Sequence, residues 1–296
     1  MSHSMKSIAI WGLWLGAVAL SLTAATPTQA TEIRRVTERV FPFASGGQIN
    51  VENRNGRITV EAWNKPEVRV QITRTVRAGD GDKAEAILKE LKAEIEVRGD
   101  RITITSRFPK RQESIGFWEI LGKVGSVQIH YYIQAPRETN LALQTSNGEV
   151  RVRGVNGVVK GTTTNGGVEV TDVHGPVEVA TTNGEIHLAE VSGSARAHTT
   201  NGGVVAEVRS LEAGDEVDLH TTNGNVESYF SNELKATLEA VTTNGRVTVS
   251  FPLTTEGVMT SKSARGKING GGNAISLSTT NGNVEVRRIG DSRSEH

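Results

Sequence analysis

The chain has 296 residues, of which 36% are hydrophobic and 32 are glycine, and its 33 basic side chains balance 33 acidic ones. This composition is typical of a folded protein and excludes general disorder, and the balanced charge argues against a nucleic-acid partner. Because the chain contains no cysteine, neither a disulfide nor a lipid-modified cysteine can form.

The first 30 residues have the pattern of an export signal. Lys6 provides a short basic segment, residues 8–25 form an apolar run, and Ala30 ends a small-residue cleavage site. We expect residues 1–30 to be a signal peptide, which places the mature protein in the periplasm, on the cell surface or outside the cell. No membrane span would remain after cleavage. The alternative is an uncleaved anchor, because the apolar run is nearly long enough to span a bilayer.

Residues 31–106 are predicted to form an N-terminal cap made of strands and one helix. Asp82 and Glu85 give a capping-box pattern, and an apolar stripe from Ala84 to Leu91 predicts a helix over residues 82–95. Strands are expected within residues 36–76 and again before residue 106. A stack of strands needs such a cap because an open end invites aggregation. The alternative is a separate small α+β domain.

Residues 107–126 lack the periodicity of their surroundings and are predicted to be an irregular loop. Phe117 and Trp118 belong to the densest apolar cluster outside the signal peptide. We expect this loop to fold onto the stack as part of the cap. The alternative is that Phe117 and Trp118 contact a partner or a membrane.

The sequence TTNG occurs six times after residue 160, with the first two copies eighteen residues apart. Apolar residues alternate with polar ones on both sides of each Asn-Gly, which predicts strand, turn and strand with one face buried. A second turn lies halfway between copies, for example at His174-Gly175. Later intervals are 22, 21 and 37 residues long. The longest interval predicts one degenerate unit, with a surface excursion over residues 254–273.

Two folds fit this repeat: an antiparallel β-meander with Asn-Gly hairpin turns, and a stack of coils. Lys160, Glu178 and Arg196 occupy equivalent outward positions with alternating charge, which is useful only if they are direct neighbours. We therefore predict an all-β fold, a parallel β-solenoid (β-helix) over residues 127–290, with about 18–22 residues per coil. Residues 291–296 are expected to be a disordered tail.

Identical corners of such a stack bring identical side chains into a row. We expect the corner asparagines to hydrogen-bond to one another along the stack. The predicted corner ladder contains Asn147, Asn165, Asn183, Asn201, Asn223, Asn244 and Asn281.

The run LALQTSNGEVRVRGVNGVVKGTTTNGGVEVTDVHGPVEVATTNGEI resembles the bacterial "putative adhesin" proteins, a β-strand-repeat family of unknown function. The earlier stretch GGQINVENRNGRITVEAWNKPEVRV resembles the start of that family's domain, so the likeness spans about residues 40–288. The resemblance implies an exported β-helix. It offers no catalytic residues to transfer to this chain.

Motifs for catalysis and for cofactor binding are missing from the sequence, and the turns lack the aspartates of calcium-binding β-rolls. His198 and His220 should stack on adjacent coils, as a weak metal site or as part of an exposed polar column. Glu169, Glu178 and Glu185 fall on outward positions, which favours a solvated face over a sugar-cleaving pair. We expect no catalytic residues, no cofactor and no metal site.

The sequence therefore predicts an exported non-enzymatic solenoid, whose adhesin-like surface binds an envelope component, a carbohydrate or a protein. The first alternative is a structural spacer or self-associating scaffold. The second is an enzyme acting on polysaccharide, which only fold-level analogy supports. Ice binding is a further idea, because Thr162 and Thr164 have a suitable spacing, but later corners do not keep it.

Overall fold

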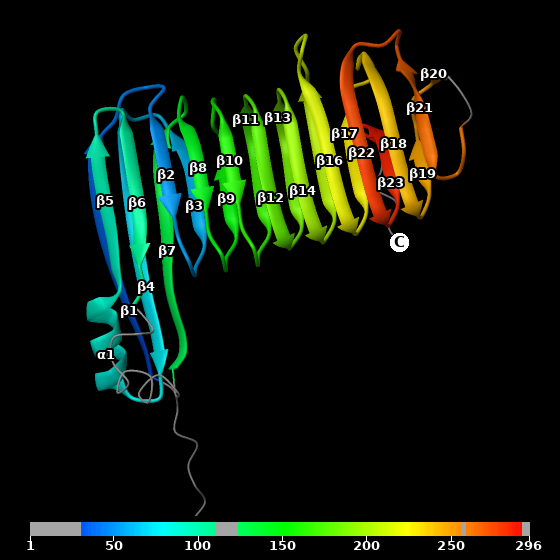
Figure 1. Cartoon of the computed structure of the whole chain (residues 1–296). Coiled ribbons are helices and arrows are strands. Elements are labelled where there is room, and N and C mark those ends of the chain that lie inside the picture. Colours follow the sequence, from blue (N-terminus) through cyan, green and yellow to red (C-terminus); the bar gives the residue numbers. More distant parts are fainter. Residues whose placement is uncertain (1–30, 110–123, 256–258, 292–296) are drawn as a thin grey trace, which may run out of the picture.

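The computed structural model describes residues 31–109, 124–255 and 259–291. The chain folds into two β-sheets that lie face to face and run the length of the molecule, with α1 at one end (Figure 1). The predicted signal peptide, residues Phe117 and Trp118, and the last five residues lie outside the described residues. None of the described helical segments has the length and apolarity to cross a membrane.

In both sheets the spatial order of the strands differs from their order in the chain. Sheet A consists of β1 (Thr31–Pro42), β4 (Glu67–Ala78), β7 (Val124–Pro136), β3 (Ile58–Trp63), β9 (Val150–Arg153), β11 (Val168–His174), β13 (Ile186–Ser192), β15 (Val204–Ser210), β17 (Val226–Phe230), β23 (Val284–Arg288) and β19 (Val247–Val249). Sheet B consists of β20 (Leu253–Thr255), β21 (Ser263–Ile268), β18 (Ala236–Asn244), β22 (Asn273–Asn281), β16 (Glu216–Asn223), β14 (Ala195–Asn201), β12 (Val177–Asn183), β10 (Val159–Thr162), β8 (Asn140–Gln144), β2 (Gln48–Glu52), β6 (Arg101–Arg107) and β5 (Lys92–Arg98).

The repeats form a parallel stack, because each coil gives one strand to each sheet and pairs with the coils on either side. Lys160 lies opposite Glu178, and Glu178 lies opposite Arg196, in parallel register. This pairing confirms the predicted parallel stack and contradicts the antiparallel meander. Neighbouring corner asparagines are 18 residues apart in the regular coils and 22 apart where a loop is longer.

The core between the sheets is filled by aliphatic side chains. Alternate residues of each strand point inward because successive side chains of a strand face opposite sides. Burying each of these side chains contributes about 1.5–3 kcal/mol. One inward row of sheet A contains six buried residues in register: Val150, Val168, Ile186, Val204, Val226 and Val284.

Coils at both ends of the stack are out of sequence order. The last coil, β22 and β23, lies between the coil of β16 and β17 and that of β18 and β19. The 37-residue interval before Asn281, for which a degenerate unit was predicted, holds the short strands β19 and β20 and the antiparallel strand β21 in place of a regular coil. The chain runs outward to β18 and β19, closes the end with β20 and β21, and returns to fill the gap. The predicted surface excursion is wrong over Ser263–Ile268, which pairs antiparallel with β18.

The N-terminal end has the same arrangement. The first coil, β2 and β3, lies between β6 and β7 on one side and β8 and β9 on the other. Antiparallel strands β5, β4 and β1 then complete the two sheets. The sheets run without a break from the cap into the stack, so residues 31–106 are not a separate domain in this structure (Figure 1).

Helix α1 (Gly81–Glu90) packs on the cap, with Ala84, Ile87 and Leu88 buried. Its N-cap is Asp80, whose carboxylate accepts a hydrogen bond from the backbone N–H of Asp82, so the predicted cap at Asp82 is wrong. The helix also ends earlier than predicted. The alternating sequence from Lys92 onward forms β5 on the edge of sheet B.

Candidate functional site

One rim of the stack is built from the TTNG corners and the related TSNG corner at residues 145–148. The first threonine of each corner is buried, and its hydroxyl donates to the carbonyl of the corner glycine in the neighbouring coil. Thr181 Oγ1, for example, lies 2.9 Å from the Gly166 oxygen. The buried threonines, in spatial order, are Thr145, Thr163, Thr181, Thr199, Thr221, Thr279 and Thr242. Each one therefore joins two coils at the corner.

The glycine is required because the coils approach closely there. A Cβ on Gly184 would lie 2.0 Å from the backbone oxygen of Gly166, and one on Gly202 would lie 2.1 Å from that of Gly184. Atoms cannot approach to such distances, so only a residue without a side chain fits.

The asparagines form a continuous ladder of side-chain hydrogen bonds. Asn183 Nδ2 donates to Asn165 Oδ1 at 2.9 Å, and the same bond recurs at 2.8–2.9 Å along the row. The row contains, in spatial order, Asn147, Asn165, Asn183, Asn201, Asn223, Asn281 and Asn244. The row ends at Asn147, whose amide donates a hydrogen bond to the Arg54 carbonyl at 3.5 Å. The amide of Asn55, at the next corner, donates instead to the Val127 carbonyl at 2.7 Å.

Each amide inside the ladder retains hydrogen-bonding capacity. An asparagine side chain has two N–H donors and two acceptor lone pairs, and the ladder uses one of each. All seven asparagines are exposed. Each inner amide therefore presents one donor and one acceptor to solvent.

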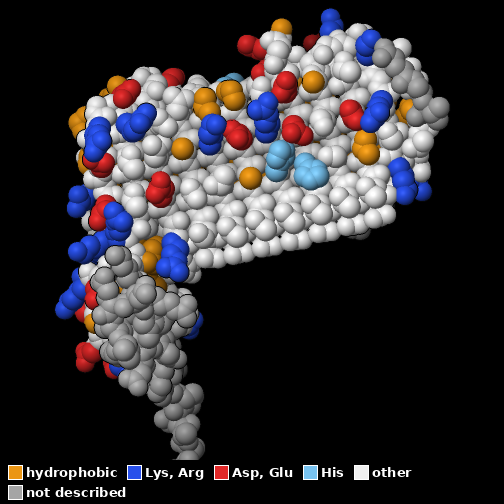
Figure 2. Space-filling model, viewed as in Figure 1, with side chains coloured by type: hydrophobic (Ala, Val, Ile, Leu, Met, Phe, Trp, Pro, Cys, Tyr) orange, Lys and Arg blue, Asp and Glu red, His pale blue; other side chains and the backbone are white. Residues whose placement is uncertain are grey.

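The next residue of each corner, a threonine or, at the Asn147 corner, Ser146, lies beside the ladder, and its hydroxyl makes no hydrogen bond within the described part of the protein. We call the ladder together with these residues the Thr–Asn edge. Its hydroxyls belong to Ser146, Thr164, Thr182, Thr200, Thr222, Thr280 and Thr243. Because parallel strands lie about 4.8 Å apart, the polar groups repeat at that spacing. The lower rim of the stack, where the arrows of β12, β14 and β16 end, carries neither charged nor hydrophobic side chains over most of its length (Figures 1 and 2).

The outer face of sheet B carries a band of mixed charge (Figure 2). Lys160 Nζ lies 2.8 Å from Glu178, and this hydrogen bond lowers the pKa of the Glu178 carboxyl. Both side chains are exposed, so the pair contributes about 1 kcal/mol at most. The alternation of charge extends from Lys160 to Asp218, and the inserted strand β22 then places the neutral Ser276 between the two acidic residues Asp218 and Glu239.

The histidines predicted to stack do so. His198 lies opposite His220 in register, with ring centroids 6.0 Å apart. His198 also contacts Asp218 at 3.1 Å, and His220 contacts Ser278 at 2.9 Å. These rings are part of an exposed polar column. No group of three or more potential metal ligands occurs within the described residues.

The three glutamates considered for sugar cleavage do not converge. Glu169 is on sheet A and pairs with Arg151 at 3.1 Å, whereas Glu178 is on sheet B. Glu185 lies at the corner between them. The two sheets therefore point these carboxylates in different directions.

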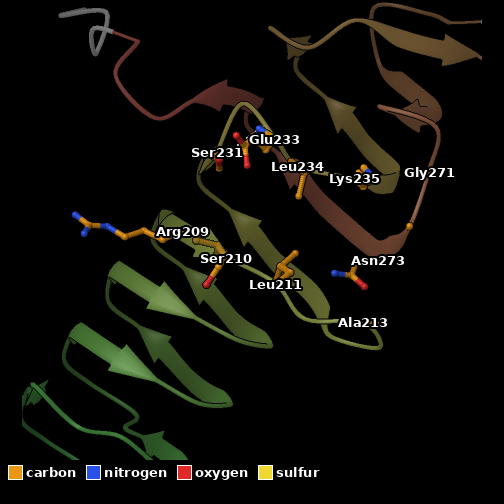
Figure 3. A pocket seen from close by; sticks show the side chains of 12 residues that line it. Arg209, Ser210, Leu211, Ala213, Ser231, Glu233, Leu234, Lys235, Gly271 and Asn273 are labelled. Carbon is orange, nitrogen blue, oxygen red and sulfur yellow. Dashed lines mark hydrogen bonds between the residues drawn. The ribbon is translucent and has the colours of Figure 1, made fainter.

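A hollow of about 440 Å³ interrupts the opposite rim, and the sequence analysis did not foresee it. Leu211 and Leu234 face each other across it, whereas Arg209 points away (Figure 3). It arises because the turns after β15 and β17 are longer than in the regular coils. The intervals of 22 and 21 residues between TTNG copies were the signal that marked these loops.

The family model Toastrack DUF4097 matches residues 46–287. The chain belongs to the Toastrack family. The residues matched in this Toastrack chain coincide closely with the stretch, about residues 40–288, over which the repeat resembles the "putative adhesin" proteins. The comparison with curated proteins found no match.

Two solved structures are similar to this chain. A "putative cell adhesion protein" from Clostridium sporogenes is 11% identical, with 88% of this chain and 100% of that chain covered and a TM-score of 0.35. A "putative adhesin" from Bacteroides fragilis is 12% identical, with 86% and 97% covered and a TM-score of 0.35. At this identity and TM-score the similarity carries no argument about the function of this Toastrack protein.

Proposed function

We propose that this Toastrack protein is exported to the periplasm or cell surface and binds an envelope component, a carbohydrate or another protein without catalysing a reaction. The Thr–Asn edge is the binding surface. The observation that carries this proposal is the row of exposed hydroxyls and half-used amides, repeated once per coil. Such groups donate hydrogen bonds to the hydroxyl and amide groups of a polymer and accept hydrogen bonds from them.

The regular spacing favours an extended ligand over a small one. A single exposed hydroxyl or amide hydrogen bond contributes only about 0.5–1.5 kcal/mol. Several contacts made in register add avidity, because each further contact forms within the same complex. A glycan strand or an extended peptide has repeated polar groups that can make contacts of this kind.

Two threonines in the middle of the edge provide the test. The double variant Thr182→Val/Thr200→Val removes two exposed hydroxyls while it keeps the β-branched shape. A matched control is Thr237→Val, an exposed threonine on the outer face of sheet B, away from the edge. Glycan arrays and pull-downs from labelled envelope fractions should show binding that the double variant weakens and the control retains. Binding that both variants retain fully would exclude the Thr–Asn edge as the surface.

A self-associating scaffold is the second candidate, and the outer edge of β1 favours it. This twelve-residue strand is last in sheet A, pairs with β4 alone among the described strands, and exposes Val36 and Val40 at 49% and 46%. Two copies paired antiparallel about Val36 would place Arg34 of one copy opposite Glu38 of the other. Light scattering tests this: a dimer that Val36→Lys converts to a monomer supports it, and a monomer at all concentrations contradicts it.

A further inference from the structure

Beyond the stack, the strands β1, β4 and β7 continue as an antiparallel arm (Figure 1). Helix α1 packs on one face of this arm through Ile87 and Leu88. The other face of the arm is mostly polar, with Val36 as an exposed apolar residue opposite Thr73. A hollow of about 530 Å³ lies on that face, and we call it the arm hollow. Its main lining residues are Arg34, Arg57, Arg77, Thr73, Thr75 and His130.

The strand register brings these residues together from distant parts of the chain. Thr75 of β4 lies between Arg34 of β1 and Gln128 of β7. One step along the same face, Arg77 lies between Glu32 and Ser126. These two adjacent rows place two guanidinium groups beside two hydroxyls, an amide and the Glu32 carboxylate.

Arg57, which directly precedes β3 of the first coil, is the third arginine that lines the arm hollow. Thr73 lies opposite His130, and the backbone N–H of Arg57 donates to His130 Nδ1 at 3.1 Å. His130 Nε2 lies 3.1 Å from Gln128 Oε1, so the imidazole is held from both sides. The arm hollow is therefore bounded by β1, β4, β7 and the residue that precedes β3.

The arm hollow has an excess of positive charge. Arg34 and Arg77 form no ion pair within the described residues, and Arg57 pairs with Glu149 at 3.0 Å. Glu32 is the single acidic side chain among the described residues that line the hollow. Burial lowers the pKa of His130, and the charges of Arg57 and Arg34 lower it further. The field of these arginines thus disfavours a further cation in the hollow and favours an anion.

We propose that the arm hollow binds a phosphate group. Guanidinium groups recognise phosphate oxygens through paired, charge-assisted hydrogen bonds, and the hydroxyls of Thr75 and Ser126 supply further donors. The phosphate is either free in solution or carried by a lipid head group. This site is separate from the Thr–Asn edge, and it does not depend on the function proposed for that edge.

The test compares two double variants that remove the same charge. Arg34→Gln/Arg77→Gln changes the arm hollow. Arg98→Gln/Arg107→Gln removes two exposed arginines from β5 and β6, outside the hollow. Thermal unfolding establishes that both variants are folded. Calorimetric titration with inorganic phosphate, and flotation with phosphatidylcholine vesicles with or without phosphatidic acid, then measure binding.

We expect the arm-hollow variant to bind at least one phosphate probe about tenfold more weakly or worse, because it loses two charge-assisted contacts. The control should bind like the unaltered protein. If the arm-hollow variant loses binding to both probes, the site accepts both free and lipid-borne phosphate. If it loses binding only to vesicles that contain phosphatidic acid, the ligand is a lipid head group. Equal loss in both double variants, or no binding of either probe by the unaltered protein, would overturn the proposal.

Discussion

Asn281 donates a hydrogen bond to Asn223 at 2.9 Å although 58 residues separate them, and Asn244 donates in turn to Asn281. The last coil therefore lies inside the stack, with an earlier coil on each side. Its insertion leaves β20 and β21 to close that end. The outermost strands there, β19 and β20, are three residues long, and such short edges offer little template for aggregation.

The two threonines of a corner should differ sharply in their effect on stability. Thr181→Val removes the hydroxyl that donates to Gly166, which leaves a carbonyl without its partner at a cost of about 1–3 kcal/mol. Thr182→Val removes an exposed hydroxyl, and its effect should stay within about 0.5 kcal/mol. Urea unfolding of both variants measures the difference. Equal effects would show that the buried threonine does not join the coils.

A second pair of variants tests the close approach of the coils. Gly202→Ala places a Cβ 2.1 Å from the Gly184 oxygen, so the corner must open, at a cost of about 3 kcal/mol or more. Gly203→Ala meets its nearest atom at 3.4 Å and should cost less than about 1 kcal/mol. Thermal unfolding measures both changes. A Gly202→Ala protein as stable as the Gly203→Ala protein would contradict the geometry of the corner.

His130 should make stability depend on pH. Its pKa is lowered from the ordinary value of 6.5 by burial and by Arg57 and Arg34. As the pH falls below 6.5, the unfolded chain therefore takes up a proton before the folded protein does. The free energy of unfolding then decreases until the pH passes the folded pKa. Above 6.5 this residue adds no pH dependence.

Nuclear magnetic resonance can follow the His130 titration directly. The midpoint should lie below 6.5, and Arg34→Gln should move it upward because one of the causes is removed. His130→Gln should abolish this part of the pH dependence of unfolding. A midpoint at or above 6.5 would contradict the described surroundings of the ring.

The parallel stack could be predicted from the sequence because each coil repeats the same local interactions. Alternating apolar residues specify the inward face, and Lys160 and Glu178 carry opposite charges at equivalent positions. The order of the coils could not be predicted, for the same reason. One corner offers the same threonine, asparagine and glycine as any other, so Asn223 can pair equally well with Asn244 or Asn281.

The arm hollow could not be predicted from the sequence, for a different reason. Arg34 and Arg77 lie 43 positions apart in the chain and meet only through the antiparallel register of β1 and β4, which no motif in the sequence marks. The sequence predicted an end of α1 that is too late, because Leu91 and Ile95 continue the helical spacing of apolar residues. In the structure the residues from Lys92 onward pair with β6 as strand β5.

Cysteine crosslinking tests the order of the coils most directly, since the chain has no cysteine of its own. Adjacent parallel strands lie about 4.8 Å apart, within disulfide range, whereas strands two positions apart lie at about twice that distance and outside it. Under mild oxidation, Asn223→Cys/Asn281→Cys should therefore form a disulfide, and Asn223→Cys/Asn244→Cys should not. A disulfide in the second variant and none in the first would contradict the inserted coil. Disulfides in neither variant would contradict the parallel stack.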